Sequence, residues 1–212
     1  MAGKVRPNQK PQPGDLSSGN LSKTISSGRR AAFSMGDLIN LQKAGYSLVL
    51  GGARSGKSTY AESVIENVGG GFYIATSEAL DEEMTARIAA HRERRGDDWQ
   101  TLEEPVLLQH ALLSIKGRGK PALVDCLTLW LSNLMELEKN IEAEIDGLCA
   151  LAEELDYPVV FVSNEVGQGI VPDNALARRF ADCAGLMNQK IAAAANTVVL
   201  VTAGIPQKLK IG

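Results

Sequence analysis

The sequence predicts an α/β fold in a single domain, in which helices cover both faces of a mainly parallel sheet. From Leu48 onward, short apolar runs alternate with longer segments of helical periodicity, and this alternation is typical of βαβ units. The runs are rich in β-branched residues and nearly free of charge, as in "VVFVS" and "TVVLVT", which is expected of strands covered on both faces. With 212 residues, of which 44% are hydrophobic, the chain can bury one good core.

Each expected element has a simple local signature. The strands are short apolar runs bounded by turn-forming or polar residues, and the helices place apolar residues three or four positions apart. The predicted strands lie near residues 47–51, 72–76, 121–125, 158–163 and 197–202. The predicted helices lie near residues 36–45, 57–67, 81–95, 105–116, 127–156 and 174–195. The segment 127–156 is long for one helix of a compact domain, so we expect a break within it.

Residues 1–45 are predicted to be a disordered extension, and residues 46–212 to form the folded domain. Residues 1–34 are rich in Pro, Gly and Ser, and their large apolar residues are too scattered to build a core. Six Lys and Arg against one Asp give this part +5, so with a net charge of −3 the remainder carries about −8. Such a leader is compatible with an organellar targeting peptide or with a plain extension.

Composition excludes several classes of protein. The nearly balanced charge argues against a general nucleic-acid binder, so no nucleic-acid partner is expected. Cys126, Cys149 and Cys183 stand far apart and form no C-x-x-C pair, which argues against a disulfide framework or a zinc site and favours a reducing cytosol. No apolar run is long enough to span a membrane, and no secretory signal opens the chain. We therefore expect a soluble cytoplasmic protein.

The segment "GGARSGKS" carries the clearest chemical signal. It satisfies the pattern G-x-x-x-x-G-K-[ST] and lies between a predicted strand and a predicted helix, as a phosphate-binding loop requires. Its glycines let successive backbone N–H groups point at one anion, Lys57 reaches the terminal phosphates, and Ser58 is a candidate Mg²⁺ ligand. These features predict a P-loop NTPase fold of the RecA-like kind. The expected phosphate-binding residues are Gly51, Gly52, Ala53, Arg54, Ser55, Gly56, Lys57 and Ser58.

Asp125 is the predicted acidic partner of this loop. It ends the apolar strand "ALVD", so it falls at the carboxyl edge of the sheet, where ligands bind. An acid on a neighbouring strand is expected to hold Mg²⁺ together with Ser58, and a cap for the following helix is the structural alternative. A regulatory GTPase is disfavoured, because no N-K-x-D follows the strand near 158–163 and Asp125 does not begin a D-x-x-G. A small-molecule kinase and a nucleotidyl transferase remain.

His91 is the candidate nucleophile of the chain. At helical spacing it is flanked by Arg87, Arg94 and Arg95, which favours a neutral imidazole and would hold a phosphate beside it. The same residue continues an apolar helical stripe, so a packed structural role stays open. His110 lies in the apolar run "VLLQHALLSI" and is expected to be a core or boundary residue.

Taken in order, several segments resemble one known family. They are "GGARSGKS", "YIATSEALDEEMTARIAAHRERR", "LVDCLTLWLSNLM", and "NEVGQGIVP" followed by "ARRFAD" and "GLMNQ". The family is the bifunctional adenosylcobinamide kinase / adenosylcobinamide-phosphate guanylyltransferase of cobalamin biosynthesis. The resemblance covers residues 47–210, and the segment that begins "NEVGQGIVP" is far more specific than any P-loop.

The resemblance implies two reactions on one scaffold. The first phosphorylates adenosylcobinamide with ATP or GTP, and the second transfers GMP from GTP onto that phosphate to give adenosylcobinamide-GDP. The transfer passes through a covalent GMP–histidine, and His91 matches that position. Mg²⁺ is the cofactor expected from the P-loop, and the resemblance implies assembly as a homotrimer.

The family's nucleotide contacts match specific positions of this chain. Besides the Gly51–Ser58 loop, they are Ala75, Thr76, Ser77, Arg92, Glu93, Arg94, Arg95, Glu103 and Asp125. The residues alone do not distinguish Glu103 from Glu104 as the carboxylate that would bind guanine. The segment 164–172 is expected to line the mouth of the site or a subunit contact. The alternative function is a P-loop kinase that acts on another alcohol or a nucleoside, with His91 in a structural role.

Overall fold

The computed structural model describes residues 38–77, 96 and 98–211. These residues belong to one compact unit, Ser34–Gly212. The leader predicted to be disordered lies outside the described residues up to residue 37, and so does the predicted helix 81–95. The helix predicted at 36–45 is wrong where it can be compared, because residues 38–44 form bends and turns. The Asn40 side chain accepts a hydrogen bond from the Gln42 amide there (2.8 Å), a local turn that competes with a helix.

The described residues form one seven-stranded sheet with the order β3-β2-β4-β5-β1-β6-β7. Every neighbouring pair is parallel except β6 and β7. The strands are β1 (Gly45–Gly51), β2 (Phe72–Ala75), β3 (Gln100–Glu103), β4 (Ala122–Asp125), β5 (Pro158–Asn164), β6 (Thr197–Thr202) and β7 (Ile205–Ile211). The five predicted strands are therefore confirmed, each to within two residues. The mainly parallel sheet agrees with the predicted fold class.

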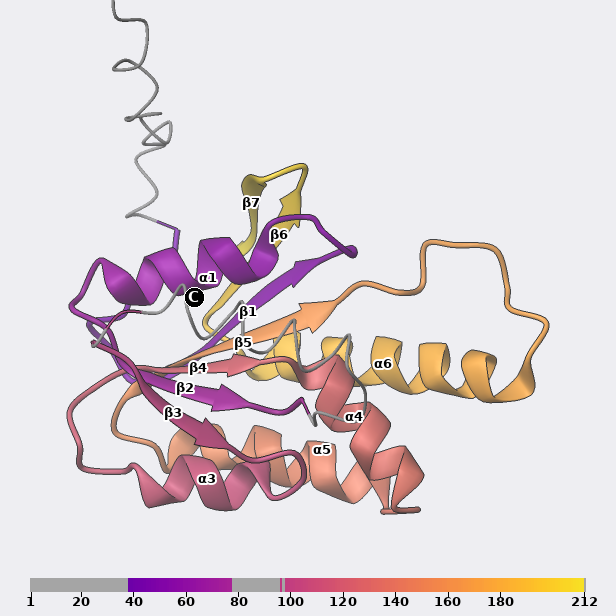
Figure 1. Ribbon diagram of the computed structural model, residues 1–212, viewed down its shortest axis with the longest axis horizontal. Helices are drawn as coiled ribbons and strands as arrows, with labels where there is room; N and C mark the ends of the chain where they lie inside the picture. Colours follow the sequence, from indigo (N-terminus) through magenta and orange to yellow (C-terminus); the bar gives the residue numbers. More distant parts are fainter. Residues whose placement is uncertain (1–37, 78–95, 97, 212) are drawn as a thin grey trace, which may run out of the picture. The chain divides into compact units, whose positions relative to one another are not determined.

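Helices cover both faces of the sheet (Figure 1). On one face lies α1 (Lys57–Glu66), and the other face carries the remaining helices that the structure describes. They are α3 (Leu108–Ser114), α4 (Leu127–Glu136), α5 (Ile141–Ala150), the 3₁₀ turn η1 (Leu151–Glu153) and α6 (Ala175–Ala194). None of the helices in the described part of the chain is long and apolar enough to cross a membrane.

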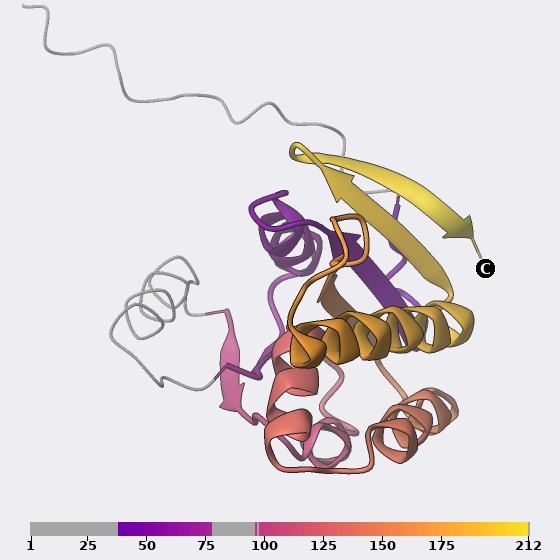
Figure 2. The same ribbon diagram turned by 90° about the vertical axis from the view of Figure 1, so that its right-hand side faces the viewer.

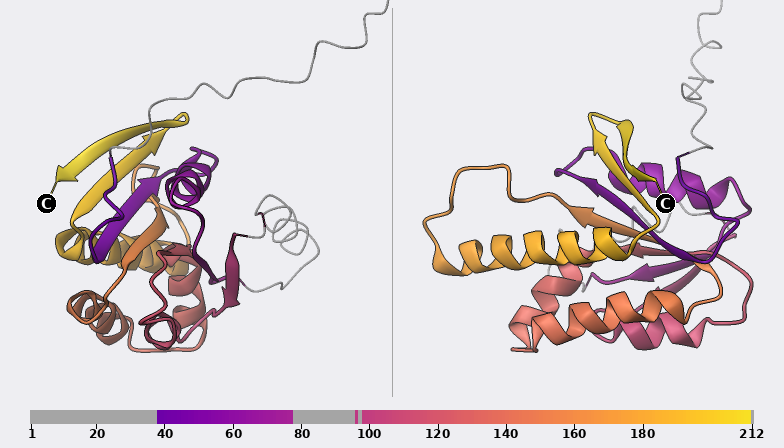
Figure 3. Two further views of the ribbon diagram at one scale, coloured as in Figure 1. Left: turned by 90° about the vertical axis from the view of Figure 1, so that its left-hand side faces the viewer. Right: turned by 180° about the vertical axis from the view of Figure 1, so that it is seen from behind.

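The break predicted within residues 127–156 is confirmed and has a local cause. Helix α4 ends before Glu138, which takes a left-handed backbone conformation with φ of 51°. Asn140 then begins α5, because its side-chain oxygen accepts a hydrogen bond from the Ala143 amide (3.2 Å). The chain thus turns back and lays α5 beside α6 on the same face of the sheet (Figure 3).

Two apolar clusters separate the sheet from its helices. On the side of α1, residues such as Val49, Tyr60 and Ile65 pack together. On the other side, the fully buried Trp130 of α4 packs among strand residues such as Phe161. Both faces of the central strands are thus buried, as their apolar sequences predict.

Two strands and one histidine differ from expectation. The edge strands β3 and β7 were not predicted, because "QTLE" and "IPQKLKI" lack a continuous apolar run. An edge strand is covered on fewer sides and tolerates such polar sequences, and also Pro206.

His110 is exposed rather than part of the core. The buried stripe of α3 is Leu108, Ala111 and Leu112, which leaves His110 off that stripe.

The parallel strands bring their carboxyl ends to a single edge of the sheet, which lies on the right in Figure 1 and faces the viewer in Figure 2. The last residues of β1 to β5, in chain order, are Gly51, Ala75, Glu103, Asp125 and Asn164. This edge is where ligands bind in open α/β sheets. The fold therefore places the predicted nucleotide residues of the described chain in one region.

Candidate functional site

The P-loop is the short connection between β1 and α1. Its backbone curls through left-handed conformations at Arg54 (φ 56°) and at Gly56 (φ 93°), the residue that caps α1. A Cβ on Gly51 would collide with the Ser55 side chain and lie 2.7 Å from the Val201 carbonyl oxygen. Glycine is therefore required at Gly51 by space and favoured at Gly56 by its backbone conformation.

The loop leaves its backbone amides available for an anion. Ser55 donates its amide hydrogen bond to the Gly52 carbonyl (3.2 Å), whereas the amides of Ala53, Arg54 and Gly56 donate to no described residue. The first turn of α1 contains no acidic residue, so the helix N-terminus keeps its full attraction for negative charge. This arrangement is a nest of N–H groups suited to phosphate.

Lys57 adds the positive charge of the site. It is the first residue of α1, and its ammonium group donates a hydrogen bond to the Gly52 carbonyl (3.3 Å) across the loop. Ser58 follows it in the first helical turn and is partly exposed. Both residues therefore open α1 directly after the loop, where the motif places them.

Two neighbouring strands hold the ends of this loop. The Gly51 carbonyl accepts a hydrogen bond from the Glu165 amide just after β5 (3.1 Å). The Ser55 carbonyl accepts one from the Gly204 amide in the turn between β6 and β7 (2.8 Å). The loop is thus fastened on two sides by backbone contacts that motif analysis did not identify.

Asp125 lies two strands away from β1, which corrects the expectation of a neighbouring strand. Strand β5 runs between them, and in its register Gly51 lies opposite Asn164 while Asp125 lies opposite Val162. This insertion of one strand between the loop and the acid supports the RecA-like arrangement. Tyr73 on β2 donates a hydrogen bond to Asp125 Oδ2 (3.1 Å) and orients the carboxylate.

The pKa of the Cys126 thiol is shifted by burial and by the charges around it. Burial raises its pKa most, and the Asp125 carboxylate raises it further, while a hydrogen bond with Thr128 and the Lys57 ammonium lower it. Asp125 and Lys57 therefore act on the same position although they belong to different elements. Burial and the raised pKa both favour the protonated thiol, which is typical of a structural cysteine.

The end of β2 is fixed by a buried polar network. The Thr76 hydroxyl, which is fully buried, donates to the Cys126 carbonyl and accepts from the Cys126 amide, both at 2.8 Å. The Asn133 side chain donates to the carbonyls of Thr76 and Pro105, both at 2.9 Å. Of the predicted Ala75–Ser77 contacts, Ala75 and Thr76 are buried and Ser77 is partly exposed. The network positions this segment, and sequence reasoning missed Asn133 entirely.

The structure separates the two candidate carboxylates at the end of β3, Glu103 as its last residue and Glu104 just after it. Glu104 accepts hydrogen bonds from the amides of Val106 (3.0 Å) and Leu107 (2.7 Å), so it serves the entry to α3. Glu103 is exposed and lies opposite Ala75 in the β2–β3 register. Of these two carboxylates Glu103 is the exposed one, and its role in binding guanine stays a prediction of the family resemblance.

Five predicted site residues lie outside the described part of the chain. They are His91, Arg92, Glu93, Arg94 and Arg95. The remaining predicted residues gather at the carboxyl edge of the sheet.

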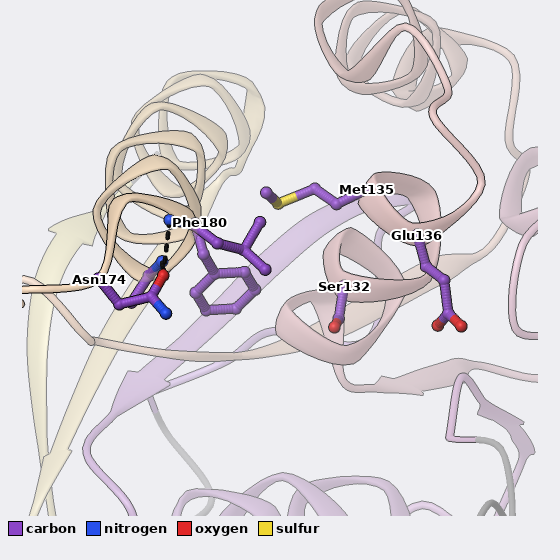
Figure 4. Close-up of a pocket in the computed structure, with 7 residues that line it drawn as sticks. Ser132, Met135, Glu136, Asn174 and Phe180 are labelled. Carbon is purple, nitrogen blue, oxygen red and sulfur yellow. Dashed lines mark hydrogen bonds between the residues drawn. The ribbon is translucent and has the colours of Figure 1, made fainter.

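A separate pocket of about 670 Å³ lies between α4 and the N-terminal end of α6 (Figure 4). Met135 and Phe180 supply its apolar wall, and Asn174 caps α6 by accepting hydrogen bonds from the amides of Leu176 (2.7 Å) and Ala177 (3.2 Å). Its lining residues in the described part of the chain are Ser132, Met135, Glu136, Asn174, Leu176, Ala177 and Phe180, and none of these is a predicted site residue.

Comparison with known proteins identifies the family of the chain. Residues 47–209 match the family described as cobinamide kinase / cobinamide phosphate guanyltransferase. The chain belongs to this family. The bifunctional adenosylcobalamin biosynthesis protein CobP of Pseudomonas aeruginosa is 46% identical over 166 residues, which are 77% of this chain and 96% of that protein. The corresponding protein CobU of Escherichia coli is 43% identical over 178 residues, covering 77% of this chain and 98% of that protein.

Family membership confirms the resemblance seen in the sequence. It also confirms the expected enzyme class, a transferase that combines kinase and guanylyltransferase activities. Among solved structures, the flagellar accessory protein FlaH from Methanocaldococcus jannaschii is similar with a TM-score of 0.47 and 12% identity, covering 82% of this chain and 81% of that one.

Proposed function

We propose that the protein phosphorylates adenosylcobinamide with ATP or GTP and then transfers GMP from GTP to the new phosphate. The product would be adenosylcobinamide-GDP. One observation supports this most directly: a P-loop with Lys57 and an opposing Asp125 occupy one sheet edge in a chain that belongs to the family. An ordinary small-molecule kinase on another substrate is disfavoured, because the match extends over residues 47–209.

The proposed nucleotide site is formed by the P-loop, the Ala75–Ser77 segment and Glu103. Phosphates would accept hydrogen bonds from the amides of Ala53, Arg54 and Gly56 and face the ammonium group of Lys57. Glu103 would accept hydrogen bonds from the N1–H and amino groups of guanine, because a carboxylate offers two acceptor oxygens. The resemblance assigns nucleotide contacts to Arg92, Glu93, Arg94 and Arg95 as well.

Mg²⁺ fits the oxygen donors of this edge. The Ser58 hydroxyl and the Asp125 carboxylate are hard ligands, and proteins bind Mg²⁺ through one or two such groups together with substrate phosphates. The Tyr73 hydroxyl donates a hydrogen bond to one oxygen of the Asp125 carboxylate, and this contact fixes the orientation of the carboxylate. When bound, the ion would neutralise charge on the phosphates.

The second half-reaction is proposed to use His91 as nucleophile. The imidazole nitrogen would attack the α-phosphorus of GTP, the bond from that phosphorus to the β-phosphate oxygen would break, and pyrophosphate would leave. The resulting P–N bond is labile, so an oxygen of adenosylcobinamide phosphate can displace the histidine and receive GMP. Neighbouring arginines would stabilise the charge that develops on the phosphate.

A homotrimer in the cytoplasm, where ATP and GTP are available, completes the proposal. Exposed apolar side chains of the loop after β5 support a partner surface, since Ile170 is 97% exposed and Val171 is 73% exposed.

We propose that residues 1–45 are dispensable for the chemistry, because the family match begins at residue 47.

Covalent labelling tests the proposal. Protein incubated with Mg²⁺ and GTP labelled at the α-phosphate should retain label after denaturation, stable in base and released by acid, as a phosphoramidate requires. His91→Ala should abolish this label and guanylyl transfer while leaving phosphorylation of adenosylcobinamide measurable. GTP labelled at the γ-phosphate is the matched control and should leave no label on the protein. Absence of covalent label from the α-labelled nucleotide would exclude the histidine route.

A further inference from the structure

Glu165 belongs to the segment 164–172, expected to line the mouth of the site or a subunit contact, but neither the motifs nor the family resemblance gives this residue a role. It follows β5, the strand between β1 and β4, so it lies on the side of the P-loop that faces Asp125. Its amide donates a hydrogen bond to the Gly51 carbonyl (3.1 Å). The backbone of Glu165 is therefore fixed against the first residue of the loop that holds the phosphates.

The Glu165 carboxylate is oriented but not fully used. Its Oε1 accepts a hydrogen bond from the Gly167 amide (2.8 Å), which fixes the direction of the side chain. Its Oε2 accepts no hydrogen bond from any described residue, and the residue is partly exposed. One oxygen is thus available to a substrate that approaches the P-loop.

The other carboxylates at this edge of the described chain have different tasks. Asp125 is engaged by Tyr73 and is the candidate Mg²⁺ ligand. Glu104 serves the entry to α3, and Glu103 ends the edge strand β3, on the far side of β2 and β4 from the loop. Glu165 is joined to the P-loop directly, through the hydrogen bond of its amide to the Gly51 carbonyl.

We infer that Glu165 is the general base of the kinase half-reaction, an inference that rests on the proposed function. The hydroxyl of adenosylcobinamide gives its proton to Glu165 Oε2 as its oxygen forms a bond to the γ-phosphorus. The bond from that phosphorus to the β-phosphate oxygen breaks, and ADP or GDP leaves with the electron pair. A carboxylate positioned in this way contributes typically 10²–10⁴-fold to rate.

The same base has no task in guanylyl transfer. There the attacking group is a phosphate oxygen that is already ionised at neutral pH, so no proton has to be removed. A base residue therefore affects one half-reaction, whereas a residue that only supports the P-loop affects both. The two roles are separable by experiment.

The test is Glu165→Gln in the full chain, with each half-reaction assayed alone. Glutamine keeps an oxygen that can accept from the Gly167 amide, so the local turn is retained while the base is lost. We expect kcat for phosphorylation of adenosylcobinamide to fall about 100-fold or more, with KM for ATP nearly unchanged. Guanylyl transfer to separately supplied adenosylcobinamide phosphate should stay near the wild-type rate.

Two further variants complete the design. Glu165→Asp keeps a carboxylate and should recover part of the lost kinase rate. Asp173→Asn removes the same charge near the other end of the loop after β5 and should leave both rates near wild type.

Near-normal kinase turnover in Glu165→Gln, or equal losses in both half-reactions, would overturn the inference. A wild-type protein that phosphorylates no adenosylcobinamide would instead refute the proposed function, and the inference with it.

Discussion

At the scale of single residues, we propose that both half-reactions depend on Lys57. Among the described residues its ammonium group donates a hydrogen bond to the Gly52 carbonyl (3.3 Å), and the side chain is partly exposed, so the charge is directed at the loop and is not buried in the core. Lys57→Ala should therefore lower kcat/KM of both half-reactions by about 10²–10³, because a preorganised charge against the phosphates is lost. The free energy of unfolding should change by no more than about 0.5 kcal/mol.

Steady-state assays of each half-reaction and urea unfolding measure these effects. Lys57→Gln is the matched variant, since it keeps a hydrogen-bond donor near Gly52 while it removes the charge. Similar losses in both variants would assign the effect to charge. Unchanged turnover in either would contradict the role of Lys57 in the P-loop.

At the scale of elements, the sequence predicted the central strands better than the edges. Strands such as β5 are apolar on both faces, and the residues that follow Pro158 in "PVVFV" are all apolar and buried. The edge strand β7 carries Lys208 and Lys210, because an edge needs no continuous apolar run. The motif likewise located Lys57 and Asp125, whose chemistry is local. It could not reveal Glu165 and Gly204, because their contacts with the P-loop come from distant parts of the chain.

The turn between β6 and β7 supports the P-loop and yields a prediction of its own. Gly204 has φ of 80°, and its amide donates to the Ser55 carbonyl (2.8 Å). Gly204→Ala meets no atom within 4 Å of the new Cβ, so its cost is conformational, roughly 1–2 kcal/mol. A shift of this turn should also weaken nucleotide binding about fivefold, which corresponds to ~1 kcal/mol.

Titration with a fluorescent GTP analogue and thermal unfolding measure the two effects. Ala203→Gly is the matched control in the same turn, because Ala203 already has a positive φ of 51° that glycine adopts without strain. It should bind nucleotide normally and be at least as stable as the wild type. Equal nucleotide affinity in Gly204→Ala and the wild type would show that the turn does not position the loop.

At the scale of the whole molecule, buried tyrosines join the sheet to its helical layers. The Tyr46 hydroxyl on β1 donates to the Leu148 carbonyl of α5 (2.8 Å), and that of Tyr157 donates to the Leu112 carbonyl of α3 (2.6 Å). Burial raises the pKa of both phenols well above the ordinary value of 10.0. Burial also raises the pKa of Tyr60 on α1 to about 12, and its hydroxyl has no hydrogen-bond partner among the described residues.

These shifts predict alkaline loss of stability with a definite sign. Because the folded state keeps the phenols protonated, their contribution is complete below pH 10 and is lost as pH rises from 10 toward the folded-state pKa values. Each such tyrosine should lower the free energy of unfolding by about 1.4 kcal/mol per pH unit in that range. Tyr60→Phe isolates one of them, since it removes an unpartnered hydroxyl and should cost little at pH 8. Urea unfolding at pH 8, 10 and 11 should then show a shallower alkaline decline in this variant, and an identical decline would contradict the burial of an un-ionised Tyr60.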